Sequence, residues 1–204
     1  MTDSSDPSAV LATTLAEVRD CTLCREYLPL GPRPVLVADS RARLLIVGQA
    51  PVTRVHASGI PWDDPSGDRL RNWLGLTPAE FYDARKIAIV PMGLCYPGRG
   101  KSGDLPPRPE CAPLWHPRIL EQLPNIKTTL LIGQYAQRYY LAEQPGPRYK
   151  NLSERVKAWR EFAPRWVPLV HPSPRNQHWL QKNPWFESQL VPQLRQRVRS
   201  LLDP

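Results

Sequence analysis

The chain has 204 residues, 41% of them hydrophobic, and a net charge of +8. This length and apolar content fit one domain, residues 1–204, and the 25 prolines are spread along the chain rather than gathered in a linker. No apolar run approaches the length of a membrane span, and residues 1–7 are acidic and polar, unlike a signal peptide. We therefore expect a cytoplasmic protein whose positive charge suits a polyanionic partner, or serves solubility alone.

Hydrophobic runs predict strands that alternate with helices. The strands are expected at 44–47, 87–90, 128–132 and 166–170. The helices are expected at 9–20, 69–74, 77–80, 114–123, 152–162 and 184–202, with one more that ends at Leu141. This alternation predicts a three-layer α/β/α sandwich around a central four-stranded, mainly parallel sheet, with the ligand site at the C-terminal ends of the strands.

The segment 47–70 contains the strongest concentration of functional residue types. Gly48 ends an aliphatic strand and lets a ligand approach the backbone closely. The prolines and glycines that follow favour a stiff loop with defined turns. Between them lie polar and aromatic candidates for a pocket: Gln49, His56, Trp62, Asp63, Asp64 and Ser66.

Two motifs in this chain resemble those of the uracil-DNA glycosylase superfamily, nearest to its iron–sulfur family 4. The first comprises Gly48-Gln49-Ala50-Pro51, Gly59-Ile60-Pro61-Trp62 and Ser66-Gly67 with Leu70, and the second is His171-Pro172-Ser173-Pro174. The likeness extends from about Cys21 to the C-terminus. It implies a monomeric, monofunctional hydrolase of base excision repair that cleaves the N-glycosidic bond of uracil, or a related damaged base, flipped out of DNA. The alternative is a non-catalytic or product-holding DNA-binding member of the same fold.

The resemblance also implies roles for particular residues. His171 would stabilise the departing base, and Trp62 would stack on it, unless Trp62 is a core residue. The expected base-binding residues are Gly48, Gln49, Ala50, Trp62, Met92, Gly93 and His171. Phosphates would be bound by Ser66, Gly67, Gly133 and Ser173, and by the basic Arg99 and Lys101. The loop of Arg175, Asn176, Gln177 and His178 would enter the duplex.

Two departures from the family pattern affect the expected chemistry. Gln49 replaces a glutamate, so Asp63 and Asp64 become the candidates for assisting water or the sugar cation, with His56 third; one of the two aspartates would otherwise only cap a turn. Pro91 replaces an asparagine that reads uracil, so backbone groups around Met92 and Gly93 are left to read the base. A covalent or product-holding variant would use His56 or His116 instead.

The four cysteines are Cys21, Cys24, Cys95 and Cys111. One close pair and two single residues do not match a zinc ribbon, and a disulfide framework belongs to small secreted chains. The resemblance to family 4 implies a [4Fe–4S] cluster, with zinc as the alternative metal and four unrelated thiols as the other possibility. The cluster would be structural and would join the 91–111 loop to the first helix.

Overall fold

The computed structural model describes residues 7–101, 103–142 and 149–203. Residues 1–6, which belong to the segment expected to differ from a signal peptide, lie outside this described part. Among the helices described, none has the length and apolar character needed to cross a membrane.

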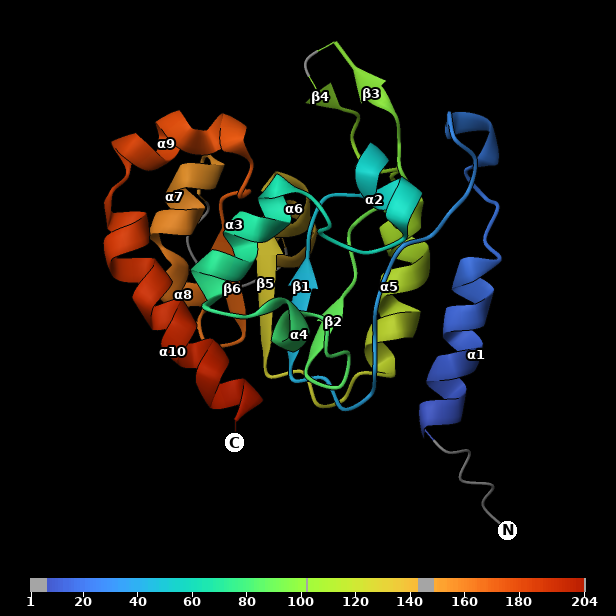
Figure 1. The fold of residues 1–204 in the computed structure, drawn as a ribbon, viewed down its shortest axis with the longest axis horizontal. Coiled ribbons are helices and arrows are strands. Elements are labelled where there is room, and N and C mark those ends of the chain that lie inside the picture. Colours follow the sequence, from blue (N-terminus) through green and yellow to red (C-terminus); the bar gives the residue numbers. More distant parts are fainter. Residues whose placement is uncertain (1–6, 102, 143–148, 204) are drawn as a thin grey trace.

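The centre of the fold is a parallel four-stranded sheet in the order β2-β1-β5-β6 (Figure 1). Its strands are β1 (Leu44–Val47), β2 (Ile87–Ile89), β5 (Thr128–Ile132) and β6 (Trp166–Leu169). Ile46 of β1 pairs with Ile89 on one side and Leu130 on the other, and Leu130 pairs with Val167. The expected strands and the parallel sheet are confirmed, with ends that differ by at most one residue.

Helices cover both faces of the sheet because successive side chains of each strand point to opposite sides. Leu44 and Ile46 belong to one core cluster, whereas Leu45 and Val47 belong to the other. The first cluster is covered by α3 (Pro65–Leu74), α4 (Pro78–Phe81), α7 (Leu152–Lys157), α8 (Trp159–Phe162), α9 (Gln177–Lys182) and α10 (Val191–Leu202). The second is covered by α1 (Pro7–Arg19), α5 (Cys111–Glu121) and α6 (Gln134–Leu141). This arrangement confirms the three-layer sandwich.

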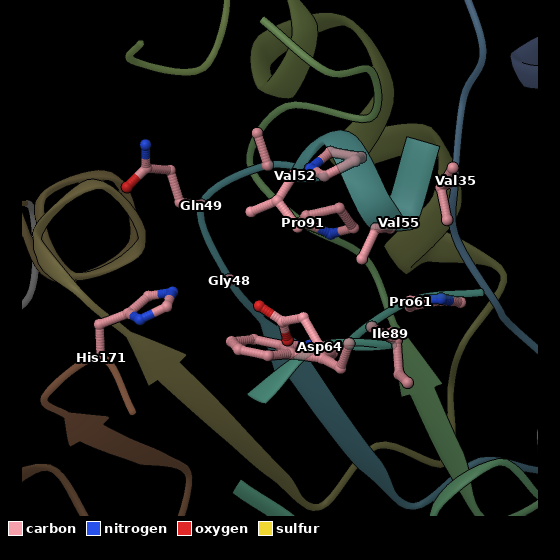
Figure 2. A pocket seen from close by; sticks show the side chains of 13 residues that line it. Val35, Gly48, Gln49, Val52, Val55, Pro61, Asp64, Ile89, Pro91 and His171 are labelled. Carbon is pink, nitrogen blue, oxygen red and sulfur yellow. The ribbon is translucent and has the colours of Figure 1, made fainter. Parts of the chain in front are cut away.

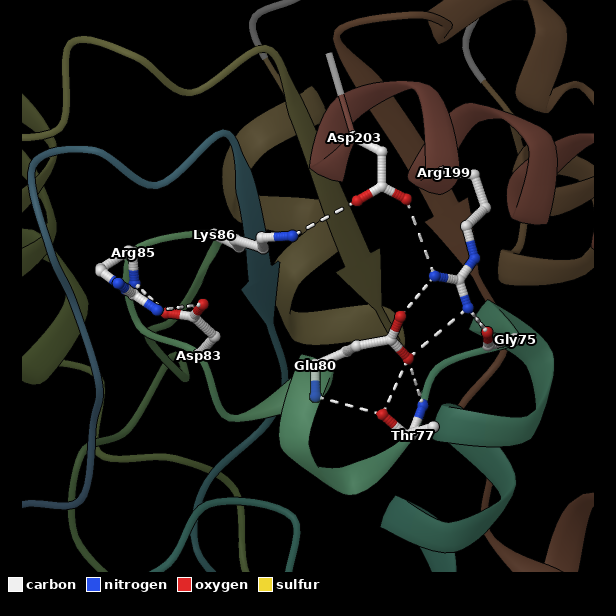
Figure 3. A network of polar contacts seen from close by, with 8 residues as sticks. All are labelled: Gly75, Thr77, Glu80, Asp83, Arg85, Lys86, Arg199 and Asp203. Atoms are coloured by element: carbon white, nitrogen blue, oxygen red, sulfur yellow. Dashed lines mark hydrogen bonds and ion pairs between the residues drawn. The ribbon is translucent and has the colours of Figure 1, made fainter.

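The C-terminal helix α10 is fastened to the α3–α4 corner by polar contacts (Figure 3). Arg199 donates to the carboxylate of Glu80 and, at 2.6 Å, to the carbonyl oxygen of Gly75. The hydrogen bonds that Glu80 accepts from Arg199 and from Thr77 lower its pKa to about 2. Glu80 also completes the expected capping box with Thr77 at the start of α4. These contacts hold α10 against α3.

Several helices differ from the prediction in their limits. α3 begins at Pro65 rather than Arg69, because Asp64 accepts a hydrogen bond from the Gly67 amide at 2.9 Å and caps the helix. α5 begins at Cys111, three residues early, and the helix expected at 152–162 breaks at Ala158 into α7 and α8. The helix expected at 184–202 begins with a π-helical turn, η3 (Phe186–Leu190).

Short elements were missed in segments that were predicted as loops or given no assignment. They are α2 (Thr53–Ser58), α9, two 3₁₀ turns at η1 (Arg25–Tyr27) and η2 (Pro174–Asn176), and a hairpin of β3 (Arg99–Gly100) with β4 (Gly103–Asp104). In Figure 1 the hairpin projects beyond the C-terminal ends of the sheet strands. It therefore stands on the same side of the molecule as the expected ligand site.

Candidate active site

The four sheet strands end at one edge, and the residue types singled out in the sequence meet there. Gly48 follows β1, Gly133 follows β5, and Pro91 and His171 each come one residue further beyond β2 and β6. Because all four strands are parallel, these positions gather around one opening. The expectation of a pocket at the C-terminal ends of the strands is met.

The opening leads into a cavity with mostly apolar walls (Figure 2). It is lined by Val35, Gly48, Gln49, Ala50, Pro51, Val52, Val55, Pro61, Trp62, Asp64, Ile89, Pro91 and His171. In Figure 2 the imidazole of His171 and the carboxylate of Asp64 both point into this space. A mainly apolar cavity with a few convergent polar groups is the usual form of a small-molecule or base pocket.

The imidazole of His171 is held in one tautomer. Its Nδ1 accepts a hydrogen bond from the Ser173 amide at 3.2 Å, so a neutral ring carries its proton on Nε2. Burial lowers the pKa of His171 below its ordinary value, although the carboxylates of Asp64 and Asp104 act in the opposite direction. The Asn176 side chain also donates to the His171 carbonyl at 2.8 Å. His171 is therefore a neutral, oriented hydrogen-bond donor at the cavity wall.

Trp62 is seated between two glycines and forms part of the cavity wall. Its backbone has φ 58, in the left-handed region that bulky residues seldom adopt. A Cβ at Gly48 would lie 2.8 Å from the indole ring, and one at Gly67 would lie 1.8 Å from the Trp62 carbonyl oxygen. The indole lies 5.5 Å from the His171 ring between centroids. The ring also packs against the core, as the alternative interpretation of Trp62 expected, and its stacking on a base stays a prediction.

The two candidate aspartates occupy different environments. Asp64 lines the cavity while one of its oxygens caps α3 through the Gly67 amide. Asp63 does not line the cavity and instead forms an ion pair with Arg54 at 3.4 Å. The structure therefore separates the pair: Asp64 faces His171, and Asp63 faces outward.

Gln49 and the backbone around Met92 are placed differently from the sequence expectation. The Gln49 side chain turns away from the cavity in Figure 2, and its Nε2 donates to the Leu105 carbonyl at 3.1 Å. The amides of Met92 and Gly93 donate to the carbonyls of Gly48 and Gln49 at 3.0 and 2.9 Å. Those amides are therefore occupied, and neither residue lines the cavity. The structure does not bring positions 92 and 93 to the cavity wall, and their expected part in reading the base stays a prediction.

The other two histidines proposed as alternatives also lie outside the cavity. His116 is 1% exposed, and its Nε2 donates to the Pro91 carbonyl at 3.0 Å while Tyr140 bonds Nδ1. Burial holds the pKa of His116 at about 4. His56 lies against Tyr96, and burial followed by the charge of Arg33 lowers its pKa. His116 thus holds the backbone of Pro91, which lines the cavity, and neither His116 nor His56 lines the cavity itself.

A wider groove adjoins the cavity, shares His171 and Asp64 with it, and is lined by most of the expected DNA-contacting side chains. Its lining includes Arg54, Ser66, Arg99, Gly103, Asp104, Ser173, Arg175 and Asn176. Lys101, Gly67 and Gly133 are not part of this lining. Gln177 and His178 lie in α9, so the loop expected there was wrong, and their entry into the duplex stays a prediction. Arg54 and Asp104 were missed because α2 and the hairpin were not predicted.

The four cysteines converge although they come from distant parts of the chain. Cys21, Cys24, Cys95 and Cys111 line one small cavity between the end of α1 and the start of α5. Burial raises the pKa of Cys111 to about 12 and that of Cys95 to about 11, so these thiols are not reactive thiolates on their own. No group of three or more cysteine, histidine or acidic side chains in the described residues is arranged to hold a metal ion.

The fold and the site together define an α/β protein with a mainly apolar pocket beside a polar groove. The sequence model of the uracil DNA glycosylase superfamily matches residues 34–195. The chain therefore belongs to the uracil-DNA glycosylase superfamily. A glycosylase-type function and DNA as the bound substrate follow from this membership.

Proposed function

We propose that the protein is a monofunctional DNA glycosylase that hydrolyses the N-glycosidic bond of uracil, or of a related damaged base, rotated into the cavity. The observation that carries this proposal is the oriented imidazole of His171. Its Nδ1 is occupied by the Ser173 amide, which leaves Nε2–H as a donor toward a mainly apolar cavity. A donor fixed at such a position stabilises the negative charge that develops on a departing base.

The remaining groups fit the parts of this reaction. The flipped base would lie beside the Trp62 ring and accept a hydrogen bond from His171 through a carbonyl oxygen. As the bond between C1′ and the base nitrogen breaks, its electron pair leaves with the base. The carboxylate of Asp64 would stabilise the cationic sugar and orient water, whose oxygen bonds C1′ and whose proton is released.

Water is the favoured nucleophile because the described lining offers no amine that could attack the sugar. None of the described residues that line the cavity or the groove is a lysine. A Schiff-base mechanism needs such an amine at the sugar. The enzyme would therefore release the base and leave the strand intact.

Selectivity for uracil would be weaker than in an enzyme with a dedicated side-chain reader. Pro91 offers the base no side-chain hydrogen bond, and its carbonyl is occupied by His116. Rejection of the wrong base depends on a buried polar group left unpaired by that base. We therefore propose a pocket that accepts uracil but discriminates poorly against cytosine or accepts other damaged bases.

A [4Fe–4S] cluster bound by Cys21, Cys24, Cys95 and Cys111 is the proposed cofactor, as in family 4. One observation supports it: the four side chains line one cavity, and cysteine thiolates are the ligands of such a cluster. The cluster would supply no catalytic step and would join α1 to the segment that carries the hairpin. Anaerobically purified protein should be brown and contain about four irons per chain; stoichiometric zinc would contradict this assignment.

The function is tested by incubating the wild-type protein with oligonucleotides that contain one uracil, single-stranded or paired with guanine or adenine. Matched oligonucleotides carry cytosine, thymine, or other deaminated and oxidised bases. Alkali then breaks the strand at each abasic site, and a gel reports the fraction cut. Cleavage at uracil or a damaged base supports the proposal. Tight binding of the same DNA without cleavage of any base would favour the non-catalytic alternative.

A further inference from the structure

Gln49 lies at the entrance of the cavity but directs its side chain to a distant segment. Its Nε2 donates to the Leu105 carbonyl at 3.1 Å, across a sequence separation of 56 residues. Figure 2 shows the amide turned away from His171 and Asp64. Leu105 directly follows β4, so this hydrogen bond connects the end of the central strand β1 to the β3–β4 hairpin.

The hairpin is a short ribbon in the part of the chain that the structure describes. Two residue pairs form its described ladder, Arg99 with Asp104 and Gly100 with Gly103. A ribbon of two strands this short is not stable by itself in water. The guanidinium of Arg175 packs closely on Gly103, where an added Cβ would lie 2.3 Å from Nη1. The Leu105 amide closes the ribbon on Gly98 at 2.9 Å. The hydrogen bond from Gln49 to Leu105 thus links the hairpin to the segment after β1 that lines the cavity.

The chemistry of this contact requires a donor at position 49. A carbonyl oxygen accepts hydrogen bonds, an amide can donate to it, and a carboxylate is an acceptor only. A glutamate at this position would therefore place its charge near the Leu105 carbonyl without a bond. The amide cannot do the acid–base chemistry of a glutamate, but it is the group that this contact needs.

We propose that Gln49 is a positioning residue that ties the 99–105 hairpin beside the cavity, so that Arg99 contacts a phosphate of the strand carrying the flipped base. This inference rests on the proposed function for its substrate. Arg99 and Asp104 of the hairpin line the same groove as Ser173 and Arg175. With the tie intact, the groove wall is preorganised before DNA arrives, which lowers the entropic cost of binding. Gln49 itself takes no part in bond breaking.

The test uses Gln49→Met, which preserves length without a donor, and Gln49→Glu, with the exposed Gln134→Met as the matched control. Trypsin should cut after Arg99 and Lys101 several-fold faster in both Gln49 variants, at an unchanged unfolding temperature. Fluorescence anisotropy with a labelled uracil-containing oligonucleotide should show a dissociation constant raised about 3- to 10-fold, as expected for one lost hydrogen bond. Both readouts need no catalysis, so they remain informative if the protein is not a glycosylase.

A double-mutant cycle makes the assignment specific. Arg99→Ala should weaken DNA binding in the wild type but have much less effect after Gln49→Met, because the untied hairpin no longer presents Arg99. Full additivity of the two changes would overturn the proposal. So would unchanged trypsin rates, or a loss of maximal cleavage rate in Gln49→Met that Gln49→Glu restores, which would indicate direct action on water.

Discussion

Replacing His171 by alanine removes a single hydrogen bond to the reacting base, and its expected cost can be worked out from the surroundings. The Nε2–H donor is lost, together with the contact between Nδ1 and the Ser173 amide. The hydrogen bond from Asn176 goes to the main-chain carbonyl of residue 171 and should persist. Because the ring borders the open cavity, its removal leaves a hydrated space rather than a void in the core. The stability loss should therefore be small.

The catalytic cost should be much larger than the structural one. Removal of one preorganised donor to a developing anion costs about 10²- to 10³-fold in rate, or about 2.7–4 kcal/mol. DNA affinity should change little, because the groove contacts that hold the backbone do not involve the imidazole donor. The loss should appear in the maximal rate and in the ratio of kcat to KM together, the pattern of an interaction made only in the transition state.

The assay is single-turnover cleavage of a uracil-containing oligonucleotide with enzyme in excess, combined with binding measured by anisotropy. Gln189→Ala is the control, since Gln189 is exposed in the C-terminal part of the chain and lines neither the cavity nor the groove. A His171→Ala protein with the wild-type rate would refute the role of the imidazole. Equal losses in the two variants would show that the effect does not arise from the donor.

Further expectations concern the acids, the glycines and the buried histidine. Asp64→Asn should slow single-turnover cleavage by at least about tenfold and still cap α3, since asparagine is also a good N-cap. Asp63→Asn should leave the cleavage rate unchanged. Equal cleavage rates in the two variants would exclude a role for Asp64. Gly67→Ala should lower the unfolding free energy more than Gly48→Ala. The new Cβ at position 67 would lie 1.8 Å from a backbone oxygen, whereas the one at position 48 would lie 2.8 Å from a side chain, and such overpacking costs about 1–3 kcal/mol. Similar thermal unfolding of the two variants would contradict this. The pKa of His116 in the folded protein, about 4, lies below its value of about 6.5 in the unfolded chain. The contribution of His116 to the unfolding free energy should therefore be complete above pH 6.5 and fall by up to about 3 kcal/mol as the pH falls toward 4. Denaturant unfolding of His116→Gln should lack this decline.

The sheet could be predicted because each strand is a short run of mostly apolar or β-branched residues, and such runs are typical of the buried strands of parallel sheets. The position of His171 followed from the same logic, since it comes directly after the last run. The hairpin at 99–104 could not be predicted, because two-residue strands rich in glycine carry no periodic signal. The direction of the Gln49 side chain depends on that hairpin, so it was also beyond sequence reasoning.

The sequence also does not show which of two adjacent aspartates lines the cavity, or that a residue outside the motifs lines it. Asp63 and Asp64 have the same chemistry, and only the start of α3 decides which of them faces the cavity. Val35 lines the cavity although it belongs to no motif, because its amide donates to the Leu94 carbonyl at 2.7 Å and holds its segment beside the cavity. The convergence of Cys21 with Cys111 was anticipated only through the family resemblance.

The central claim is that the wild-type protein breaks the bond between base and sugar and leaves the strand whole. Mass spectrometry of a single-uracil oligonucleotide after incubation, without alkali or heat, measures both outcomes at once. We expect free base together with a full-length strand in which a hydroxyl replaces the base. A strand of unchanged mass in a stable complex with the protein, or one broken at the uracil, would contradict the account.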